Sequence, residues 1–237
     1  MKNYVILLAG GVGARMNAPI PKQFLLIDNK PIIAYTIDRF EKNDSVDGIA
    51  VVCVKEWVEH LKKVISTYSW KKVKWIIEGG KTGHDSIRNG VFFLRTELDD
   101  EDFVIVHDAV RPIVPQMVID DLLLVAHKNG NSASSIVCHP PIVYTDDGIS
   151  GNKDVDREHV MLTAAPQAFN YGLVYRLYKQ AEAENLHNFT YTSSLLIHYG
   201  YAVFFSKGIT SNIKITKKED LPLFEALLTI PEERLME

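Results

Sequence analysis

Cysteine is scarce in this chain of 237 residues, which contains only Cys53 and Cys138. The two lie far apart, each within an apolar run, and neither has partner residues at the spacing of a metal or redox site. We therefore interpret both as small hydrophobic side chains, buried in a protein of a reducing compartment.

Long apolar stretches and a surplus of positive charge are missing as well. No run is long enough to span a bilayer, and the chain enters an apolar strand at Tyr4 with no signal-peptide pattern ahead of it. We therefore expect a cytoplasmic protein without a membrane partner. The net charge of −4 argues against a nucleic-acid groove, although a few focused cations can still bind a small anion.

A glycine-rich loop directly follows the first apolar run. Residues 4–8 have the composition of a buried parallel strand. The glycines after them are Gly10, Gly11 and Gly13. Glycines let the backbone turn sharply and approach a ligand, and successive N–H groups in such a turn form an anion-binding concavity. Arg15 and Lys22 add positive charge at the same edge, so this region predicts a triphosphate site.

Other interpretations of these glycines compete with that one. A tight turn between a strand and a helix also uses glycine. The dinucleotide-binding fingerprint begins at Gly11 but lacks its third glycine, because Met16 stands there. The Walker A pattern is absent because no Gly-Lys-Ser/Thr follows. A nucleotide site with cations from its own loop remains the favoured interpretation.

Strand-like and helix-like patterns alternate along most of the chain. Strands are predicted at residues 4–8, 49–54, 73–77, 103–106, 132–137 and 212–216, and helices at 31–42, 57–68, 85–98, 118–127 and 221–228. This order predicts an α/β fold with a doubly wound, mostly parallel, Rossmann-like sheet. We expect one domain over residues 1–237.

Three loops would meet at the carboxyl ends of the strands, where such sheets bind ligands. They cover residues 10–15, 79–86 and 107–112. Residues 140–160 interrupt the alternation with polar, turn-rich sequence, and an excursion of this length is usually functional or an interaction arm. We interpret it as a protruding, hairpin-like arm.

The loop after the strand at 103–106 carries several chemically capable residues. Asp108 is suited to holding a divalent ion that bridges nucleotide phosphates, or alternatively to capping the next turn. Arg111 has the geometry to pair with a phosphate. His107 is better explained as a packed, hydrogen-bonded residue than as an acid or base.

Three further polar residues remain ambiguous from their spacing alone. Ser86, after Gly79 and Gly80, has a hydroxyl that can either recognise a base edge or cap a helix. Arg157 and Lys214 are lone cations, for which a solvated surface position is the simpler interpretation.

Hydrolase signatures are absent, since neither G-x-S-x-G nor H-E-x-x-H occurs. Nucleotidyl transfer to a phosphate needs neither, because an ionised phosphate acceptor requires no general base. Such a site must align two anions and neutralise the charge at the attacked phosphorus, which lysines, arginines and a metal ion can do.

Taken together, the motifs resemble those of the polyol-phosphate cytidylyltransferases, which include the ribitol-5-phosphate and 2-C-methyl-D-erythritol 4-phosphate enzymes. The resemblance covers essentially the whole chain. It rests on residues 8–16, 21–24, 79–86, 106–112, 165–169 and 212–216. It implies CTP and a polyol phosphate as substrates, CDP-polyol and pyrophosphate as products, and Mg²⁺ as cofactor.

The resemblance also implies a role for each matching residue. Catalysis would involve Arg15, Lys22, Arg157 and Lys214. CTP would contact Leu8, Ala9, Gly10, Gly11, Gly13, Gly79, Gly80, Asp85, Ser86 and Asp108, with Asp108 also near the metal. The acceptor would contact Arg111, Arg157, Lys214 and Thr190. The arm would exchange with a second subunit to form a homodimer, so that Arg111 and Arg157 serve the neighbouring site.

The sequence departs from the resembled pattern at several positions. On the acceptor and metal side, relatives carry an Asp-Thr pair at Pro141 and Ile142, an acidic residue at Tyr191 and an aspartate at Ser211. On the nucleotide side, an arginine is replaced at Gly83 or His84. Other segments are closer to the ribitol-5-phosphate branch, which we favour over the methylerythritol branch. A nucleotide-dependent oxidoreductase and a catalytically inactive CTP-binding subunit remain alternatives.

Overall fold

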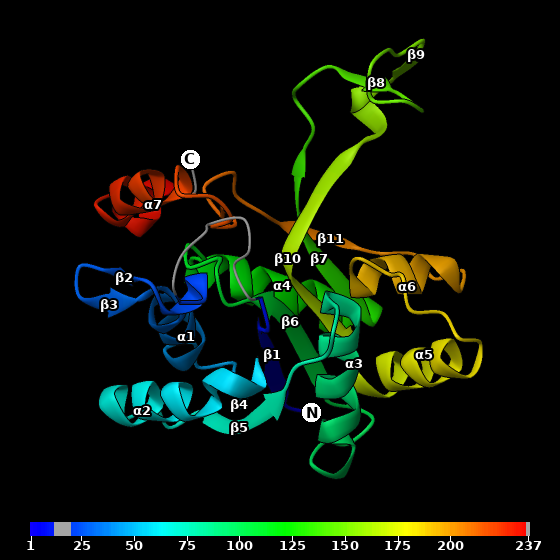
Figure 1. Cartoon of the computed structure of the whole chain (residues 1–237). Coiled ribbons are helices and arrows are strands. Elements are labelled where there is room, and N and C mark those ends of the chain that lie inside the picture. Colours follow the sequence, from blue (N-terminus) through cyan, green and yellow to red (C-terminus); the bar gives the residue numbers. More distant parts are fainter. Residues whose placement is uncertain (12–19, 236–237) are drawn as a thin grey trace.

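A seven-stranded sheet forms the centre of the computed structural model, which describes residues 1–11 and 20–235 (Figure 1). Its strand order is β11-β7-β10-β6-β1-β4-β5. The strands are β1 (Asn3–Ala9), β4 (Gly48–Cys53), β5 (Val73–Glu78), β6 (Phe103–Asp108), β7 (Asn131–Val137), β10 (Met161–Asn170) and β11 (Phe205–Lys207). Strand β10 is antiparallel to β6 and β7, and the other neighbouring pairs are parallel. The prediction of a mostly parallel α/β sheet is confirmed.

Helices cover both faces of this sheet. They are α1 (Ile32–Glu41), α2 (Val58–Tyr68), α3 (Gly83–Phe93), α4 (Gln116–Asn129), α5 (Tyr171–Ala183), α6 (Thr192–His198) and α7 (Asp220–Leu228). Within the described residues, none of them combines the length and apolar character that a membrane crossing requires.

Alternate residues of β1 belong to two different hydrophobic cores. Val5 and Leu7 pack with side chains of α1, α2 and α4, whereas Tyr4 and Ile6 pack with side chains of α3, α5 and α6. Because successive side chains of a strand point to opposite faces, a strand that is apolar throughout must be covered on both sides. The continuous apolar runs of the sequence therefore produce the doubly wound arrangement.

The predicted strand at residues 212–216 is wrong. This segment forms no ladder, although its backbone is fixed by single hydrogen bonds such as the one from Ile215 N to Val110 O at 2.9 Å. Ile213 and Ile215 pack in a third core with side chains of α7, while Asn212 is also buried and Lys214 lines both cavities. The two isoleucines at alternate positions therefore imitate the apolar pattern of a strand here. The actual strand in this part of the chain is the short β11.

The segment at 140–160 protrudes from the sheet as predicted (Figure 1). Its two short strands, β8 (Ile142–Tyr144) and β9 (Lys153–Val155), form a separate antiparallel sheet. They continue beyond β7 and β10, which are paired up to Val137 and Met161. Large apolar side chains at Val143, Tyr144 and Ile149 are exposed there. The role of this arm in dimerisation stays a prediction.

Candidate active site

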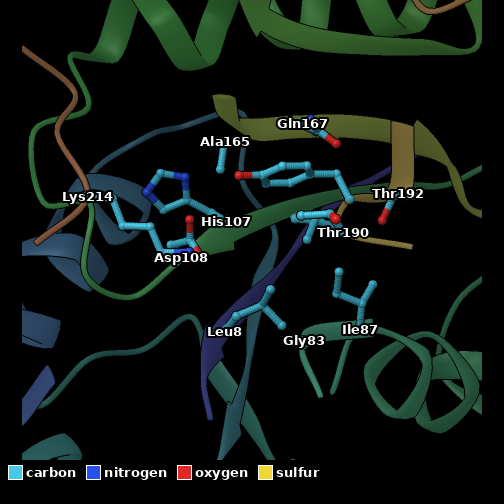
Figure 2. A pocket seen from close by; sticks show the side chains of 12 residues that line it. Leu8, Gly83, Ile87, His107, Asp108, Ala165, Gln167, Thr190, Thr192 and Lys214 are labelled. Atoms are coloured by element: carbon cyan, nitrogen blue, oxygen red, sulfur yellow. Dashed lines mark hydrogen bonds and ion pairs between the residues drawn. The ribbon is translucent and has the colours of Figure 1, made fainter. Parts of the chain in front are cut away.

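Two adjoining cavities lie at the carboxyl ends of β1, β5 and β6. The larger, of about 330 Å³, is lined by Leu8, Gly10, Gly11, Lys22, Gly80, Lys81, Thr82, Gly83, Ser86, Asp108, Val110 and Lys214. The smaller, of about 110 Å³, is lined by Leu8, Gly83, Ile87, Val106, His107, Asp108, Ala165, Gln167, Thr190, Tyr191, Thr192 and Lys214 (Figure 2). Leu8, Gly83, Asp108 and Lys214 belong to both, so the cavities form one continuous site.

The start of the glycine-rich loop lines the larger cavity through Gly10 and Gly11. A Cβ at Gly10 would lie 3.2 Å from Ser86 Oγ, closer than ordinary van der Waals contact. Glycine therefore lets the loop after β1 approach the first turns of α3. Gly13 and Arg15 lie outside the described residues.

Lys22 reaches the larger cavity from a short 3₁₀ helix, Lys22–Phe24. Its side chain is largely buried, and its Nζ donates to the carbonyl oxygen of Ile215 at 2.8 Å. The adjacent Gln23 donates to the carbonyl oxygen of Ala9 at 2.7 Å, which fixes this helix to the end of β1. The structure thus places an ammonium group beside Gly10 and Gly11, as the triphosphate interpretation requires.

The loop between β5 and α3 is held by a capping box. Thr82 caps α3 by accepting from Asp85 N at 3.1 Å, and Asp85 accepts from Thr82 N at 3.2 Å. Ser86 does not cap the helix: its Oγ accepts from Gly80 N at 3.1 Å and donates to Thr82 O at 2.9 Å. Burial acts to raise the pKa of Asp85, but the Thr82 hydrogen bonds and Arg88 hold it below its ordinary value. Asp85 supports the loop from outside the cavity lining.

Asp108 is the carboxylate common to both cavities, and two cations hold it. Oδ1 lies 2.9 Å from Lys214 Nζ and Oδ2 lies 3.0 Å from Arg111 Nε. Burial acts to raise the pKa of Asp108, but the charges of Lys214 and Arg111 hold it below its ordinary value, so the carboxylate stays ionised. Arg111 also donates to Asn212 O at 2.8 Å. Asp108 therefore joins the loop after β6 to the segment at 212–216 and does not serve as a turn cap.

His107 is a packed residue, as predicted. Its Nε2 lies 3.0 Å from Arg111 O and its ring lies edge-on to Phe40. Burial lowers the pKa of His107 to about 4, so the imidazole is neutral at neutral pH. Neutral His107 holds the turn that carries Asp108 and Arg111.

Residues at the start of α6 and directly before it form one wall of the smaller cavity. Figure 2 shows Thr190, Thr192 and Gln167 on the side of the cavity away from Lys214. Gln167 lies on β10, next to a shift of register between Ala164 and Gln167. This wall adds hydroxyl and amide groups to a cavity whose other side carries charge.

Arg157 is not brought to these cavities. It opens a short 3₁₀ helix, Arg157–His159, beside β9 on the arm, where its NH1 donates to His139 O at 2.7 Å. Arg111, by contrast, contacts Asp108 at the junction of the two cavities, although Arg111 is not among the lining residues of either one.

Comparison with known proteins identifies the family. The sequence matches the 2-C-methyl-D-erythritol 4-phosphate cytidylyltransferase (IspD) family over residues 3–230. This chain belongs to that cytidylyltransferase family. Similar curated proteins include ribitol-5-phosphate cytidylyltransferases of Lacticaseibacillus paracasei (36% identical over 225 residues, 94% of this chain and 96% of the relative) and Vibrio parahaemolyticus (38% over 237 residues, 97% of each). A 2-C-methyl-D-erythritol 4-phosphate cytidylyltransferase of Clostridium botulinum is 36% identical over 227 residues, which cover 96% of this chain and 97% of the relative.

Solved structures agree with this assignment. The Francisella tularensis 2-C-methyl-D-erythritol 4-phosphate cytidylyltransferase superposes with a TM-score of 0.80 at 26% identity, covering 95% of this chain and 99% of that one. A 4-diphosphocytidyl-2C-methyl-D-erythritol synthase from Anaerococcus prevotii has the same fold, with a TM-score of 0.82 at 24% identity, covering 97% and 96% of the two chains.

Sequence reasoning missed part of this cytidylyltransferase site. Thr82 was detectable, because Thr82-x-x-Asp85 ahead of an apolar-periodic segment resembles a capping box. Ile87 and Thr192 carry no comparable signal, and Gln167 lies in the motif at residues 165–169 without a role assigned to it. They become site residues only through the packing of α3, β10 and α6 around the smaller cavity.

Proposed function

We propose that this cytidylyltransferase transfers CMP from CTP to ribitol 5-phosphate or a closely related alditol phosphate, releasing pyrophosphate. The observation that carries the proposal is the pair of cavities that meet at Asp108 and Lys214. A transferase must hold donor and acceptor at once with their reacting atoms adjacent. A charged junction between two binding spaces meets that need.

In this proposal the larger cavity binds CTP. The backbone from Leu8 to Gly13, including Ala9, Gly10 and Gly11, surrounds the triphosphate, while Arg15 and Lys22 supply positive charge. The loop with Gly79, Gly80, Asp85 and Ser86 recognises the cytosine and ribose. The buried position of Lys22 supports this assignment, because a lysine with little access to water interacts strongly with a nearby anion.

The acceptor occupies the smaller cavity with its phosphate near Lys214 and its hydroxyl groups toward Thr190. An oxygen of the acceptor phosphate attacks the α-phosphorus of CTP. One P–O bond forms as the bond between the α- and β-phosphates breaks, and pyrophosphate leaves with the bonding electrons. Lys22, Arg15 and Lys214 stabilise the charge that develops at the attacked phosphorus.

Mg²⁺ is the proposed cofactor, with Asp108 as its protein ligand. The described residues contain no cluster of three or more His, Cys, Asp or Glu side chains able to hold a metal. Mg²⁺ commonly binds one or two carboxylates together with substrate phosphates, so one carboxylate beside a triphosphate site suits it. A carboxylate offers about four lone-pair positions, and the two cations of Asp108 leave some of them available. Bound there, Mg²⁺ would neutralise phosphate charge.

The arm is proposed to join two copies of the chain in a cytoplasmic homodimer. Exposed apolar side chains at Val143, Tyr144 and Ile149 support an arm that is covered by another surface. Arg157, which has no place at its own subunit's cavities, would then serve the acceptor phosphate of the neighbouring site, together with Arg111.

A second acceptor, 2-C-methyl-D-erythritol 4-phosphate, is favoured by a specific observation. The matching family carries that enzyme's name, and the Clostridium botulinum relative is as similar in identity as the Lacticaseibacillus paracasei one. The two acceptors differ in the branching methyl group and the number of hydroxyl groups. The smaller cavity would distinguish the two acceptors, because its lining combines apolar and hydroxyl-bearing side chains.

The deciding experiment measures pyrophosphate release with CTP and Mg²⁺ for a panel of acceptors. The panel contains ribitol 5-phosphate, other alditol phosphates and 2-C-methyl-D-erythritol 4-phosphate, with EDTA controls. Turnover with ribitol 5-phosphate at the highest kcat/KM supports the proposal, and a preference for the methylerythritol compound supports the second acceptor. CTP binding without turnover on any acceptor contradicts both.

A further inference from the structure

The acceptor-side wall has little support from its own segment of chain. Thr190, Tyr191 and Thr192 line the smaller cavity, and none of them lines the larger one. Thr190 and Tyr191 lie between the end of α5 at Ala183 and α6, a helix of only seven residues that begins at Thr192. Thr190 is exposed, and the connection that precedes it has no regular secondary structure. Contacts from elsewhere must therefore fix the position of this wall.

Gln167 supplies such a contact from the sheet. Its Nε2 donates to Ser193 Oγ at 3.1 Å, and its Oε1 accepts from Ser193 N at 3.3 Å. One amide side chain thus holds both the hydroxyl and the backbone of the residue that follows Thr192. A second contact, between Tyr178 OH and Thr192 Oγ1 at 3.1 Å, acts on the same turn.

Gln167 is itself held rigidly. It is 3% exposed, and its backbone pairs with Val106 of β6 on one side and Ala133 of β7 on the other. Val106 is two residues before Asp108, which lies at the junction of the cavities. Gln167 therefore fixes the distance between the sheet that carries the charged junction and the loop that faces it.

We propose that Gln167 is a positioning residue that sets the affinity for the acceptor by holding Thr190–Thr192, without acting on CTP. The inference rests on the proposed function and goes beyond it, because it assigns acceptor affinity to a buried amide that acts through Ser193. Both polar ends of Gln167 are engaged by Ser193, and the three residues directly before Ser193 line the smaller cavity and not the larger one.

The test compares Gln167→Met, which keeps the side chain's approximate length and removes both hydrogen bonds, with wild type. Neutral hydrogen bonds contribute about 0.5–1.5 kcal/mol each, so loss of two predicts an acceptor KM raised about tenfold. The KM for CTP is expected to stay within about twofold, because the larger cavity is unchanged. The control is Gln180→Met on α5, which removes an exposed hydrogen bond to Glu184 and should leave both constants unchanged.

Ser193→Ala separates positioning from direct contact with the acceptor. This variant loses the bond to Oγ but keeps the one from Ser193 N, so the acceptor KM should rise by about threefold. If Gln167 acts through Ser193, adding Ser193→Ala to Gln167→Met should cause little further loss. Fully additive effects would mean that Gln167 contacts the acceptor itself, which overturns the inference.

The remaining outcomes are also decisive. Equal increases in the KM for CTP and for the acceptor, or a Gln167→Met enzyme with an unchanged acceptor KM, overturn the inference while the proposed function stands. A wild-type protein that neither turns over nor, by calorimetry, binds any polyol phosphate overturns the proposed function and this inference together.

Discussion

Lys214 Nζ lies 2.9 Å from Oδ1 of Asp108, which links two residues 106 positions apart at the point where the two cavities meet. The contact joins the end of β6 to the segment beneath α7. It keeps an ionised carboxylate in a largely buried place and holds the lysine ammonium at the border of the smaller cavity.

Replacing this lysine should impair the reaction more than the fold. Lys214→Met is expected to lower kcat/KM for the acceptor about a hundredfold, equivalent to about 3 kcal/mol of transition-state stabilisation. The free energy of unfolding should fall by only about 1 kcal/mol, since Arg111 still pairs with Asp108. Steady-state kinetics and urea unfolding measure the two effects, with exposed Lys218→Met as the control. Equal kcat/KM values for the Lys214→Met and Lys218→Met variants would contradict a role of Lys214 in the reaction.

Lys22→Ala tests the cation on the nucleotide side. Loss of a charge that stabilises the transition state predicts a fall in kcat of roughly a hundredfold, or about 3 kcal/mol. Pyrophosphate release at saturating substrates provides the measurement, and Lys62→Ala on exposed α2 is the control. Unchanged turnover in Lys22→Ala would falsify the assignment of the larger cavity to CTP.

The capping box of α3 predicts a stability effect that is coupled to nucleotide affinity. Thr82→Ala removes the cap, which should lower the free energy of unfolding by about 1 kcal/mol and raise the KM for CTP. The matched control is Thr67→Ala on α2, where the hydroxyl donates to Lys63 O within the helix and caps nothing. Chemical denaturation of both variants decides the point: equal stabilities would show that the box contributes little.

Gly80→Ala should disturb the same loop by steric clash. A Cβ at Gly80 would lie 2.8 Å from the carbonyl carbon of Asp85, and this backbone atom cannot move without breaking the cap. We expect a lower melting temperature and weaker CTP binding. For stability the control is Gly83→Ala, where an added Cβ meets no atom within 4 Å. Equal melting temperatures for the Gly80→Ala and Gly83→Ala variants would contradict the predicted clash at Gly80.

His84 predicts a pH dependence of stability. Its ring is buried against Tyr178 and Phe189, at centroid distances of 5.2 and 5.7 Å. Burial lowers the pKa of His84, with Arg88 and His187 acting in the same direction and Asp85 opposing them. The unfolded chain therefore binds a proton at His84 near pH 6.5, whereas the folded protein binds it only at lower pH. The contribution of neutral His84 to the free energy of unfolding is full above pH 6.5 and is lost as the pH falls toward the lowered pKa of the folded state.

The His84 effect is measured as the difference between two unfolding series. Urea unfolding of wild type and His84→Phe from pH 7.5 to 5.5 should show a steeper loss of stability on acidification for wild type. Parallel curves would mean that His84 protonates equally in the folded and unfolded states.

The pattern of apolar residues in the sequence was enough to predict most strands of the sheet. Such a local pattern could not reveal which residues far apart in the sequence come into contact. The run of residues 4–8 indicates a buried strand because both of its faces are apolar, and β1 is covered on both faces. The same reasoning fails at 212–216, where alternating Ile213 and Ile215 lie against α7 without a ladder. The contact of Lys22 with Ile215 spans 193 positions, and Gln167 meets Ser193 only because β10 and α6 pack together. No periodicity carries such information.

The division of the lining residues also bears on how acceptors change during evolution. A substitution at Leu8, Gly83, Asp108 or Lys214 alters both cavities, because these residues border both of them. Thr190, Tyr191 and Thr192 border only the smaller cavity, so under the proposed assignment of the cavities a mutation there would exchange the acceptor and leave nucleotide use intact. A lineage can thus diverge in the alcohol it activates without losing its cytidylyl donor, consistent with the two kinds of acceptor named among the relatives of this chain.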